Sequence, residues 1–413
     1  MSESAPHAVF AHRDFIRFQL ARFLSTVGTQ IASVAVGWQV YELTHRKLDL
    51  GFVGLAQFAP AVTLSLVTGS VADRFERRRV VALCHGLIAL CFVALVALYR
   101  ARVTDPRPIY AVLVVFGTAR AFLGPSNQAL MPTLIPPEMF ARGMAWGSSI
   151  WQIAAVSGPA LGGLLWAPLR GNVYALSAAL SVISMALALS LHPRVTADEK
   201  KRGVSRDDVL AGVRYVWRNK IVLGSVSLDL FAVLFGGAVA LLPVFARDIL
   251  HTGAWGAGVL RSAPAAGATA MALWLAYHPL ERNAGRAMLS CVAVFGVATV
   301  AFGLSESFAL SVLALAVTGA VDMVSVVVRQ HVVQLATPDA MRGRVSAVNL
   351  VFVSTSNELG EFESGLTAEA FGPVAAVVGG GIATILVVAL WSRLFPALRE
   401  LDRPSDLGGR EAT

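Results

Sequence analysis

The sequence predicts an all-α polytopic membrane protein with twelve transmembrane helices in two pseudo-symmetric six-helix bundles. The chain of 413 residues is 56% hydrophobic and 15% charged, whereas about a quarter of the residues in a soluble domain are charged. Its mean hydropathy is +0.65. Apolar runs of about twenty residues, the length that crosses a bilayer as a helix, recur along the chain. A membrane β-barrel would show short alternating segments instead.

Charge clusters separate the apolar runs into two groups of six. The first run follows His12, Arg13 and Arg17, contains Arg22 and leads into no cleavage pattern, so it is a retained span and not a signal peptide. The first six expected spans are 18–43, 50–72, 80–99, 109–130, 145–165 and 173–191. The second six are 221–245, 256–277, 287–304, 308–333, 345–366 and 374–395. We therefore expect an N-terminal bundle over 1–192 and a C-terminal bundle with a tail over 221–413.

A basic segment over 193–220 separates the two expected bundles. It contains eight Lys and Arg residues, and Val209, Val213, Val216 and Trp217 follow one another at amphipathic helical spacing. This pattern predicts a linker that ends in a helix on the membrane surface.

The distribution of basic residues predicts the orientation of the chain, because basic loops remain in the cytoplasm. Most of the 34 Lys and Arg residues fall on the side of the two termini and the 193–220 linker. The opposite side holds Arg46, Lys47, Arg100, Arg102, Arg107, Arg170 and Arg247. Both termini are therefore expected in the cytoplasm, with the protein in the inner membrane. The net charge of +8 has the same origin and does not indicate nucleic-acid binding.

An internal repeat at an offset of 201 residues supports the two bundles. The loop 134–143, between spans four and five, resembles the loop 335–344, between spans ten and eleven. Leu134, Pro137 and Glu138 correspond to Leu335, Pro338 and Asp339. Similar loops at one fixed offset are typical of transporters with duplicated halves.

The charged burst 69–79 after span two carries the resemblance to a known family. Gly69, Asp73, Arg74, Arg77 and Arg78 match the loop motif of the major facilitator superfamily, with Glu76 in place of the motif's second glycine. The resemblance implies that Asp73 engages the start of span eleven and holds the cytoplasmic side closed, since a helix N-terminus attracts a carboxylate. The alternative is a set of basic residues that only anchors the topology.

Span five resembles the antiporter motif of that superfamily. It contains Gly158, Pro159, Gly162 and Gly163, while Ala154 replaces the motif's first glycine. The glycines permit close helix contact and the proline permits a bend. The resemblance implies export, and the alternative is plain helix packing.

Ionisable groups within the spans are the candidates for coupling, because each costs at least about 2.5–3.5 kcal/mol at membrane depth unless it is paired or hydrated. Arg120 and Asp322 occupy nearly equivalent positions under the 201-residue offset, and Arg120 matches part of the family's fourth-span motif. Asp322, Ser325 and Arg329 share one helical face by their spacing. A static charge pair inside a bundle is the alternative.

Two further groups complete the expected cavity. Span one carries a polar stripe that includes Arg22 and Thr29, and Asp229 is a lone acid in span seven that either lines a pocket or pairs locally. In span eleven, Glu358 and Glu361 stand three residues apart on one face. Neighbouring carboxylates in a low dielectric resist ionising together, which suits reversible protonation. Glu363 follows two residues later, and the alternative places Glu363, with or without Glu361, near the outer interface without a coupling role.

The run 357–365 looks like the subgroup of major facilitators that includes enterobactin exporters. The expected function is therefore proton-coupled export of a siderophore or another amphiphilic small molecule by alternating access. Multidrug or macrolide efflux and transport of a lipid-like solute are the alternatives. We expect a monomer in contact with membrane lipids, without a metal or a cofactor. A membrane-embedded enzyme or a sensor is the alternative of a different class, but no phosphate-binding, nucleophile-elbow or zinc-ligand motif favours it.

Overall fold

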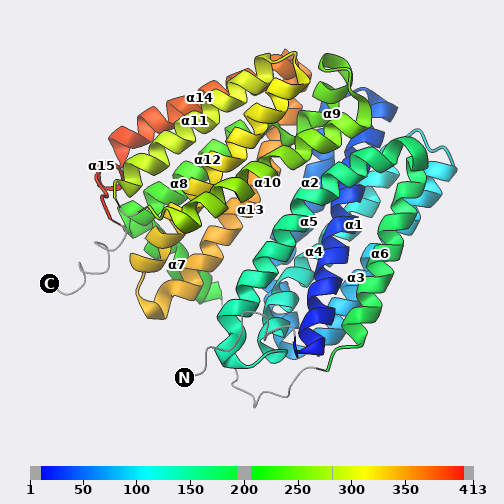
Figure 1. Ribbon diagram of the computed structural model, residues 1–413, viewed down its shortest axis with the longest axis horizontal. Helices are drawn as coiled ribbons and strands as arrows, with labels where there is room; N and C mark the ends of the chain where they lie inside the picture. The colour runs from blue at the N-terminus through cyan, green and yellow to red at the C-terminus, as the bar shows by residue number, and fades with distance from the viewer. Residues whose placement is uncertain (1–10, 193–205, 281, 404–413) are drawn as a thin grey trace. The chain divides into compact units, whose positions relative to one another are not determined.

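The protein is helical throughout the part that the computed structural model describes, residues 11–192, 206–280 and 282–403 (Figure 1). Twelve long helices correspond to the twelve expected spans within those residues. The first six are α1 (Arg13–Thr44), α2 (Lys47–Arg74), α3 (Arg77–Arg100), α4 (Arg107–Leu130), α5 (Phe140–Leu169) and α6 (Val173–Leu189). The second six are α8 (Lys220–Gly236), α10 (Gly253–Tyr277), α11 (Ala284–Leu304), α12 (Phe308–Leu335), α13 (Asp339–Phe371) and α14 (Pro373–Leu394). The predicted all-α class is confirmed.

Three shorter helices lie between or after the long ones: α7 (Arg206–Arg218), α9 (Leu242–Val244) and α15 (Pro396–Arg399). The long helices often extend beyond the apolar runs, because helical hydrogen bonding continues where the chain leaves the apolar layer. Within the described residues, seven stretches are long and apolar enough to cross a membrane by those two properties alone. One of them, Pro137–Leu189, joins α5 and α6, whereas the more polar α1 and α13 are not among the seven.

The chain forms two compact units. Unit 1 comprises Met1–Thr44 and Ala56–Val204, and unit 2 comprises His45–Leu55 and Ser205–Thr413. In unit 1, α1 packs against α5 and α6, and α3 packs against α4 and α6. In unit 2, α8 packs against α13 and α14, and α11 packs against α12 and α14. The first helix of each six thus contacts the fifth and sixth, and the third contacts the fourth and sixth. This shared pattern is the structural counterpart of the 201-residue repeat.

The start of α2 belongs to unit 2 because it docks on the end of α13. The backbone N–H groups of Lys47 and Leu48 donate to Glu369 Oε2 at 2.9 and 3.4 Å. One turn later the rings of Phe52 and Phe362 lie with their centroids 5.8 Å apart. The Glu369 carboxylate therefore satisfies N–H groups that have no partner within α2.

The sequence predicts one continuous α-helix over 221–245 for the seventh span, and this prediction is wrong in its second half. The α-helix ends at Gly236, and a 3₁₀ turn (Ala238–Leu241), α9 and a π-helical turn (Phe245–Ile249) follow. Gly237 has φ −76° and ψ 77°, outside the helical region. Its carbonyl accepts a hydrogen bond of 2.7 Å from Ser364 Oγ of α13. This contact satisfies a backbone group that the break would otherwise leave without a partner.

The C-terminal segment caps the start of α11. Asp402 Oδ1 accepts from the N–H of Asn283 at 2.8 Å, and the carbonyls of Asp402 and Leu401 accept from Ala284 and Gly285 at 3.0 Å each. These residues satisfy the first donors of the helix. The N–H of Asn283 is also the main reason why the pKa of the Asp402 carboxyl lies below its ordinary value, with Arg282 and Arg403 contributing.

Candidate functional site

Unit 2 contains an acidic hollow between α8, α11 and α12, which we call the C hollow. Aliphatic and aromatic side chains form most of its wall, and two carboxylates and a hydroxyl are its polar groups. It is lined by Asp229, Ala232, Val233, Cys291, Val292, Phe295, Val321, Asp322 and Ser325. Two acids that lie 93 residues apart in the chain therefore share one site.

Asp229 of α8 is neutralised by an arginine across the helix contact. Arg329 Nη1 of α12 forms an ion pair with Asp229 Oδ1, and each side chain is 5% exposed. Asp229 therefore both lines the hollow and pairs locally, so the two alternatives that its sequence position left open occur together. A pair this buried is held by its mutual attraction, because either partner alone would be an uncompensated charge.

Asp322 differs from Asp229 in having no counter-charge. It lies two helical turns before Arg329 on α12, is half-buried, and makes no hydrogen bond or ion pair with any residue of the described chain. Ser325, one turn along, is 1% exposed, and its hydroxyl also has no hydrogen-bond partner among the described residues. The C hollow thus contains one carboxylate and one buried hydroxyl that have no partner among the described residues.

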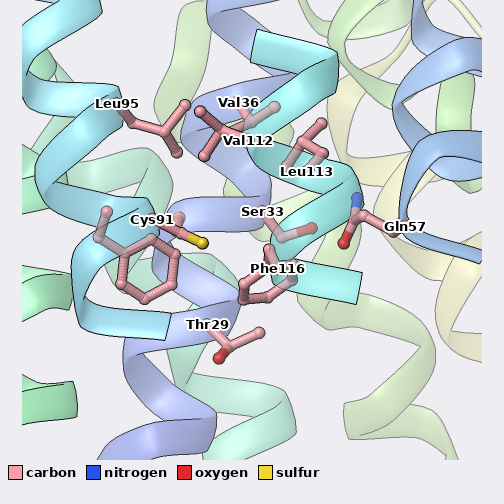
Figure 2. Close-up of a pocket in the computed structure, with 11 residues that line it drawn as sticks. Thr29, Ser33, Val36, Gln57, Cys91, Leu95, Val112, Leu113 and Phe116 are labelled. Atoms are coloured by element: carbon pink, nitrogen blue, oxygen red, sulfur yellow. The ribbon is translucent and has the colours of Figure 1, made fainter. Parts of the chain in front are cut away.

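Unit 1 contains a second hollow, the N hollow, between α1, α3 and α4 with one residue of α2 (Figure 2). Figure 2 shows Thr29, Ser33, Gln57 and Cys91 grouped near Phe116. The described lining residues are Thr29, Ala32, Ser33, Val36, Gln57, Cys91, Phe92, Leu95, Val112, Leu113 and Phe116. None of these lining side chains is charged, so the N hollow offers hydroxyl, amide and aromatic surface.

Of the three arginines predicted for coupling or for the cavity, the two in unit 1, Arg22 and Arg120, are not among the described lining residues of the N hollow. Arg22 Nη1 donates to Gln19 Oε1 at 3.2 Å, and its guanidinium lies 5.6 Å from the centroid of the Phe18 ring. Arg120 is exposed and lies 5.7 Å from the Phe116 ring centroid. Arg120 belongs to unit 1 and Asp322 to unit 2. A functional link between Arg120 and Asp322 therefore stays a prediction.

The two glutamates of span eleven are half-buried on α13. The Glu361 carboxylate lies against α2, because a Cβ atom on Gly54 would come within 2.8 Å of Glu361 Oε2. Glu358 stands one turn earlier on the same helix. A role of either glutamate as proton carrier stays a prediction.

The charged burst 69–79 covers the end of α2 and the start of α3 and is described in part. The side chains of Asp73 and Arg74 and the surroundings of Gly69 lie outside the described residues, so the latch of Asp73 stays a prediction. Arg77 Nη1 donates to the carbonyl of Ala129 at 3.1 Å, and Arg78 Nη1 donates to that of Leu191 at 2.8 Å. These two arginines hold the start of α3 against the ends of α4 and α6.

Glu76, where this chain departs from the family motif, occupies the N-cap position of α3 with φ −60° and ψ 108°. Its carboxylate lies 2.8 Å from Arg78 Nη2 and 2.5 Å from Arg79 Nε. An acid at a helix start is favourable. Where the family motif has a glycine, this chain therefore has a glutamate that stabilises the turn by pairing with two arginines.

The glycines of α5 lie in the contact with α1. A Cβ atom on Gly158 would come within 2.6 Å of Gln30 Cβ, and one on Gly162 within 2.9 Å of the Ile31 carbonyl oxygen. Pro159 and Gly163 are also buried, and α5 continues through both of its internal prolines. Close packing is therefore present at this motif, and its role in export remains a proposal.

Polar or thiol lining residues that sequence reasoning did not assign to a site include Gln57, Cys91 and Cys291. Ser325 was recognised only as sharing the helical face of Asp322 and Arg329. Cys91 and Cys291 lie 200 residues apart and line equivalent hollows, so the repeat offset was a signal that would have found them.

Comparison with known sequences identifies a family and similar proteins of nearly the same length. The family described as transmembrane secretion effector matches residues 4–407. The enterobactin exporter of Citrobacter koseri is 27% identical over 401 residues, 95% of this chain and 94% of its own length. The enterobactin exporter of Shigella boydii serotype 18 is 28% identical over 398 residues, 94% and 93% of the two chains.

Solved structures show the same fold. A single-residue mutant of the nucleoside transporter NupG superposes with a TM-score of 0.74 at 16% identity, covering 93% of this chain and 100% of that one. A bacterial homologue of the lysosomal transporter Spinster, inward-facing and occupied, gives 0.73 at 14% identity, with coverage of 96% and 99%. At these identities the likeness concerns the arrangement of the helices.

Proposed function

Because the chain belongs to the transmembrane secretion effector family of the major facilitator superfamily, and is thus a multi-pass transporter of the inner membrane, we propose that it is a proton-coupled exporter. It exchanges protons entering the cell for an amphiphilic small molecule leaving it, by alternating access. Both termini lie in the cytoplasm, as the distribution of basic residues favours, and the chain works as a monomer. The relatives and structural neighbours are transporters and not enzymes.

The observation that carries the proposal is the difference between the two acids of the C hollow. Arg329 neutralises Asp229, whereas Asp322 in the same hollow has no ion-pair partner among the described residues. A carboxylate without a counter-charge in an apolar wall is suited to exchange its charge for a proton in each cycle. Asp322 is therefore the first candidate for the proton carrier, and Glu358 and Glu361 of α13 are the next.

The other predicted residues take supporting roles in this cycle. Arg22, Thr29 and Arg120 contribute to the substrate cavity of unit 1. The motif of Gly69, Asp73, Arg74, Arg77 and Arg78 gates the cytoplasmic side, and the group Gly158, Pro159, Gly162 and Gly163 bends α5. No covalent step is required, because transport is a sequence of binding and conformational steps.

The substrate is a siderophore or a related amphiphile. Relatives over nearly the whole chain are enterobactin exporters. The uncharged N hollow, with Thr29, Ser33 and Gln57 beside Phe92 and Phe116, favours an aromatic solute with hydrogen-bonding groups. A macrolide is the second candidate, as the resemblance of the sequence to macrolide-type efflux proteins implies.

The test is uptake of enterobactin or erythromycin into everted membrane vesicles that carry an imposed proton gradient. We expect accumulation that a protonophore abolishes. Accumulation that is independent of the gradient, or no uptake of either solute, would contradict proton-coupled export.

Two variants then identify the carrier. Asp322→Asn should reduce gradient-driven accumulation at least tenfold while solute exchange without a gradient continues, and Glu358→Gln should have a smaller effect. Glu306→Gln, an exposed carboxylate between α11 and α12, is the matched control and should transport normally. Full coupling in the Asp322 variant would assign the proton to another group.

A further inference from the structure

We propose that α7 is a docking surface for the headgroups of anionic phospholipids, with Trp217 at the level of the bilayer interface and Arg214, Arg218 and Lys220 as the cations that contact the lipid. Neither membership of the family nor the proposed transport cycle assigns a binding partner to α7. The inference rests on which faces of α7 the protein covers and which it leaves uncovered.

The inner face of α7 is fixed to unit 2. A Cβ atom on Gly212 would come within 2.9 Å of the Arg344 carbonyl oxygen, so the helix backbone touches α13. Val216 is 2% exposed in the core of the unit. Tyr215 Oη donates to the carbonyl of Ala336, at the end of α12. The helix therefore lies across the ends of α12 and α13 instead of extending into water.

The connection to α8 fixes the depth of α7. Asn219 is the single residue between α7 and α8, and its side chain accepts from the N–H groups of Ile221 and Val222 at 3.2 Å each. The apolar span begins at Lys220, directly after this cap. The last turn of α7 therefore lies at the membrane surface.

The rest of α7 divides into two uncovered sectors, since successive residues of a helix are about 100° apart. Val213 and Trp217 form one sector beside the inner face and are 37% and 69% exposed. Arg214 and Arg218 form the next sector, and both are exposed, as is Lys220. Trp217, Arg214 and Arg218 make no side-chain hydrogen bond, ion pair or ring contact with the described part of the chain.

This order of sectors matches the layers of a lipid surface. Tryptophan favours the boundary between acyl chains and headgroups, and arginines one sector further out reach the phosphate layer. Each cation near an anionic surface strengthens binding by about fivefold. The anionic headgroup, and not a free phosphate, is the ligand because the apolar sector with Trp217 would gain nothing from a small soluble anion.

The test uses the full chain in nanodiscs that contain phosphatidylcholine with a minority of phosphatidylglycerol. Trp217→Phe, compared with the parent chain, isolates the fluorescence of Trp217. We expect brominated phosphatidylglycerol to quench this fluorescence more than brominated phosphatidylcholine at the same mole fraction. Equal quenching by the two lipids, or quenching by neither, would overturn the proposal.

Charge variants provide the second arm. Arg214→Gln and Arg218→Gln should each lower the preference for phosphatidylglycerol by about fivefold with an unchanged unfolding temperature, because both side chains are exposed. Arg107→Gln, an exposed arginine at the start of α4, is the control and should keep the preference. An unchanged preference in both α7 variants, or competition by soluble glycerol phosphate at equal concentration, would overturn the assignment to lipid.

Discussion

The two hollows occupy equivalent places in the two units and differ in charge. Each lies between the first, third and fourth helices of its unit, and each contains one cysteine, Cys91 in unit 1 and Cys291 in unit 2. Among the described residues, the N hollow has no charged lining side chain, whereas the C hollow has Asp229 and Asp322. The two units have thus kept the same helix packing and differ in the chemistry of the lining, which is uncharged among the described residues of one hollow and carries two carboxylates in the other.

The largest effect should come from the ion pair that occurs in the C hollow. Arg329→Gln leaves the Asp229 carboxylate buried without its partner, so we expect a loss of about 3–5 kcal/mol in unfolding free energy. Thermal unfolding in detergent measures this loss. Removing both charges in Asp229→Asn with Arg329→Gln should restore much of the stability. Equal stability of the single variant and the parent would mean that the pair is not buried as described.

The second effect concerns the contact between the fifth and the first helix, which occurs inside each of the two units. Gly162 of α5 touches α1 in unit 1, and Gly360 of α13 touches α8 in unit 2, since a Cβ atom at either position would come within 2.9 Å of a carbonyl oxygen. Gly162→Val should therefore destabilise the protein by about 1–3 kcal/mol through overpacking. Gly124→Val, at a position with open space around the added Cβ, is the control. A stable Gly162 variant with impaired export would point to the bend, not to packing.

The third prediction compares the charge of the hollows directly. In variants that retain one cysteine each, a cationic methanethiosulfonate should modify Cys291 about tenfold faster than an anionic one, because the Asp322 carboxylate in the same hollow attracts the cation and repels the anion. The ratio at Cys91 should be near one. Asp322→Asn should lower the ratio at Cys291. Equal ratios at both cysteines would remove the distinction between the hollows.

The smallest effect concerns how the third helix of each unit begins, with Glu76 at the start of α3 and Asp402 at the start of α11. Because the folded pKa of Asp402 is lowered, its contribution to stability is complete above the ordinary pKa of an aspartate. The contribution is lost as the pH falls through the lowered value. Asp402→Asn removes it at neutral pH.

Amide hydrogen exchange of residues 283–285 measures that contribution. The Asp402 variant should exchange about twofold faster than the parent at neutral pH, and the difference should disappear in acid. Glu400→Gln, which removes a neighbouring exposed carboxylate, should leave the exchange unchanged. Protection that persists in the Asp402 variant would show that the backbone carbonyls of the tail are sufficient.

The sequence by itself determined the membrane class, the twelve helices and the repeat. Hydropathy over about twenty residues and the spacing of Asp322, Ser325 and Arg329 on one helical face are local properties, so they survive whatever the helices pack against. The loop motifs and the run 357–365 likewise pointed to the family before any contact was known.

Only the tertiary structure decided which charges meet. Three contacts join helices far apart in the chain. They are the ion pair of Arg329 with Asp229, the hydrogen bond from Ser364 to the Gly237 carbonyl, and the cap of Glu369 on α2. Such contacts depend on how far each helix is rotated and shifted against its neighbours. Hydropathy constrains that rotation weakly inside a membrane, where lipid and protein are both apolar, and the polar partner is therefore fixed by packing.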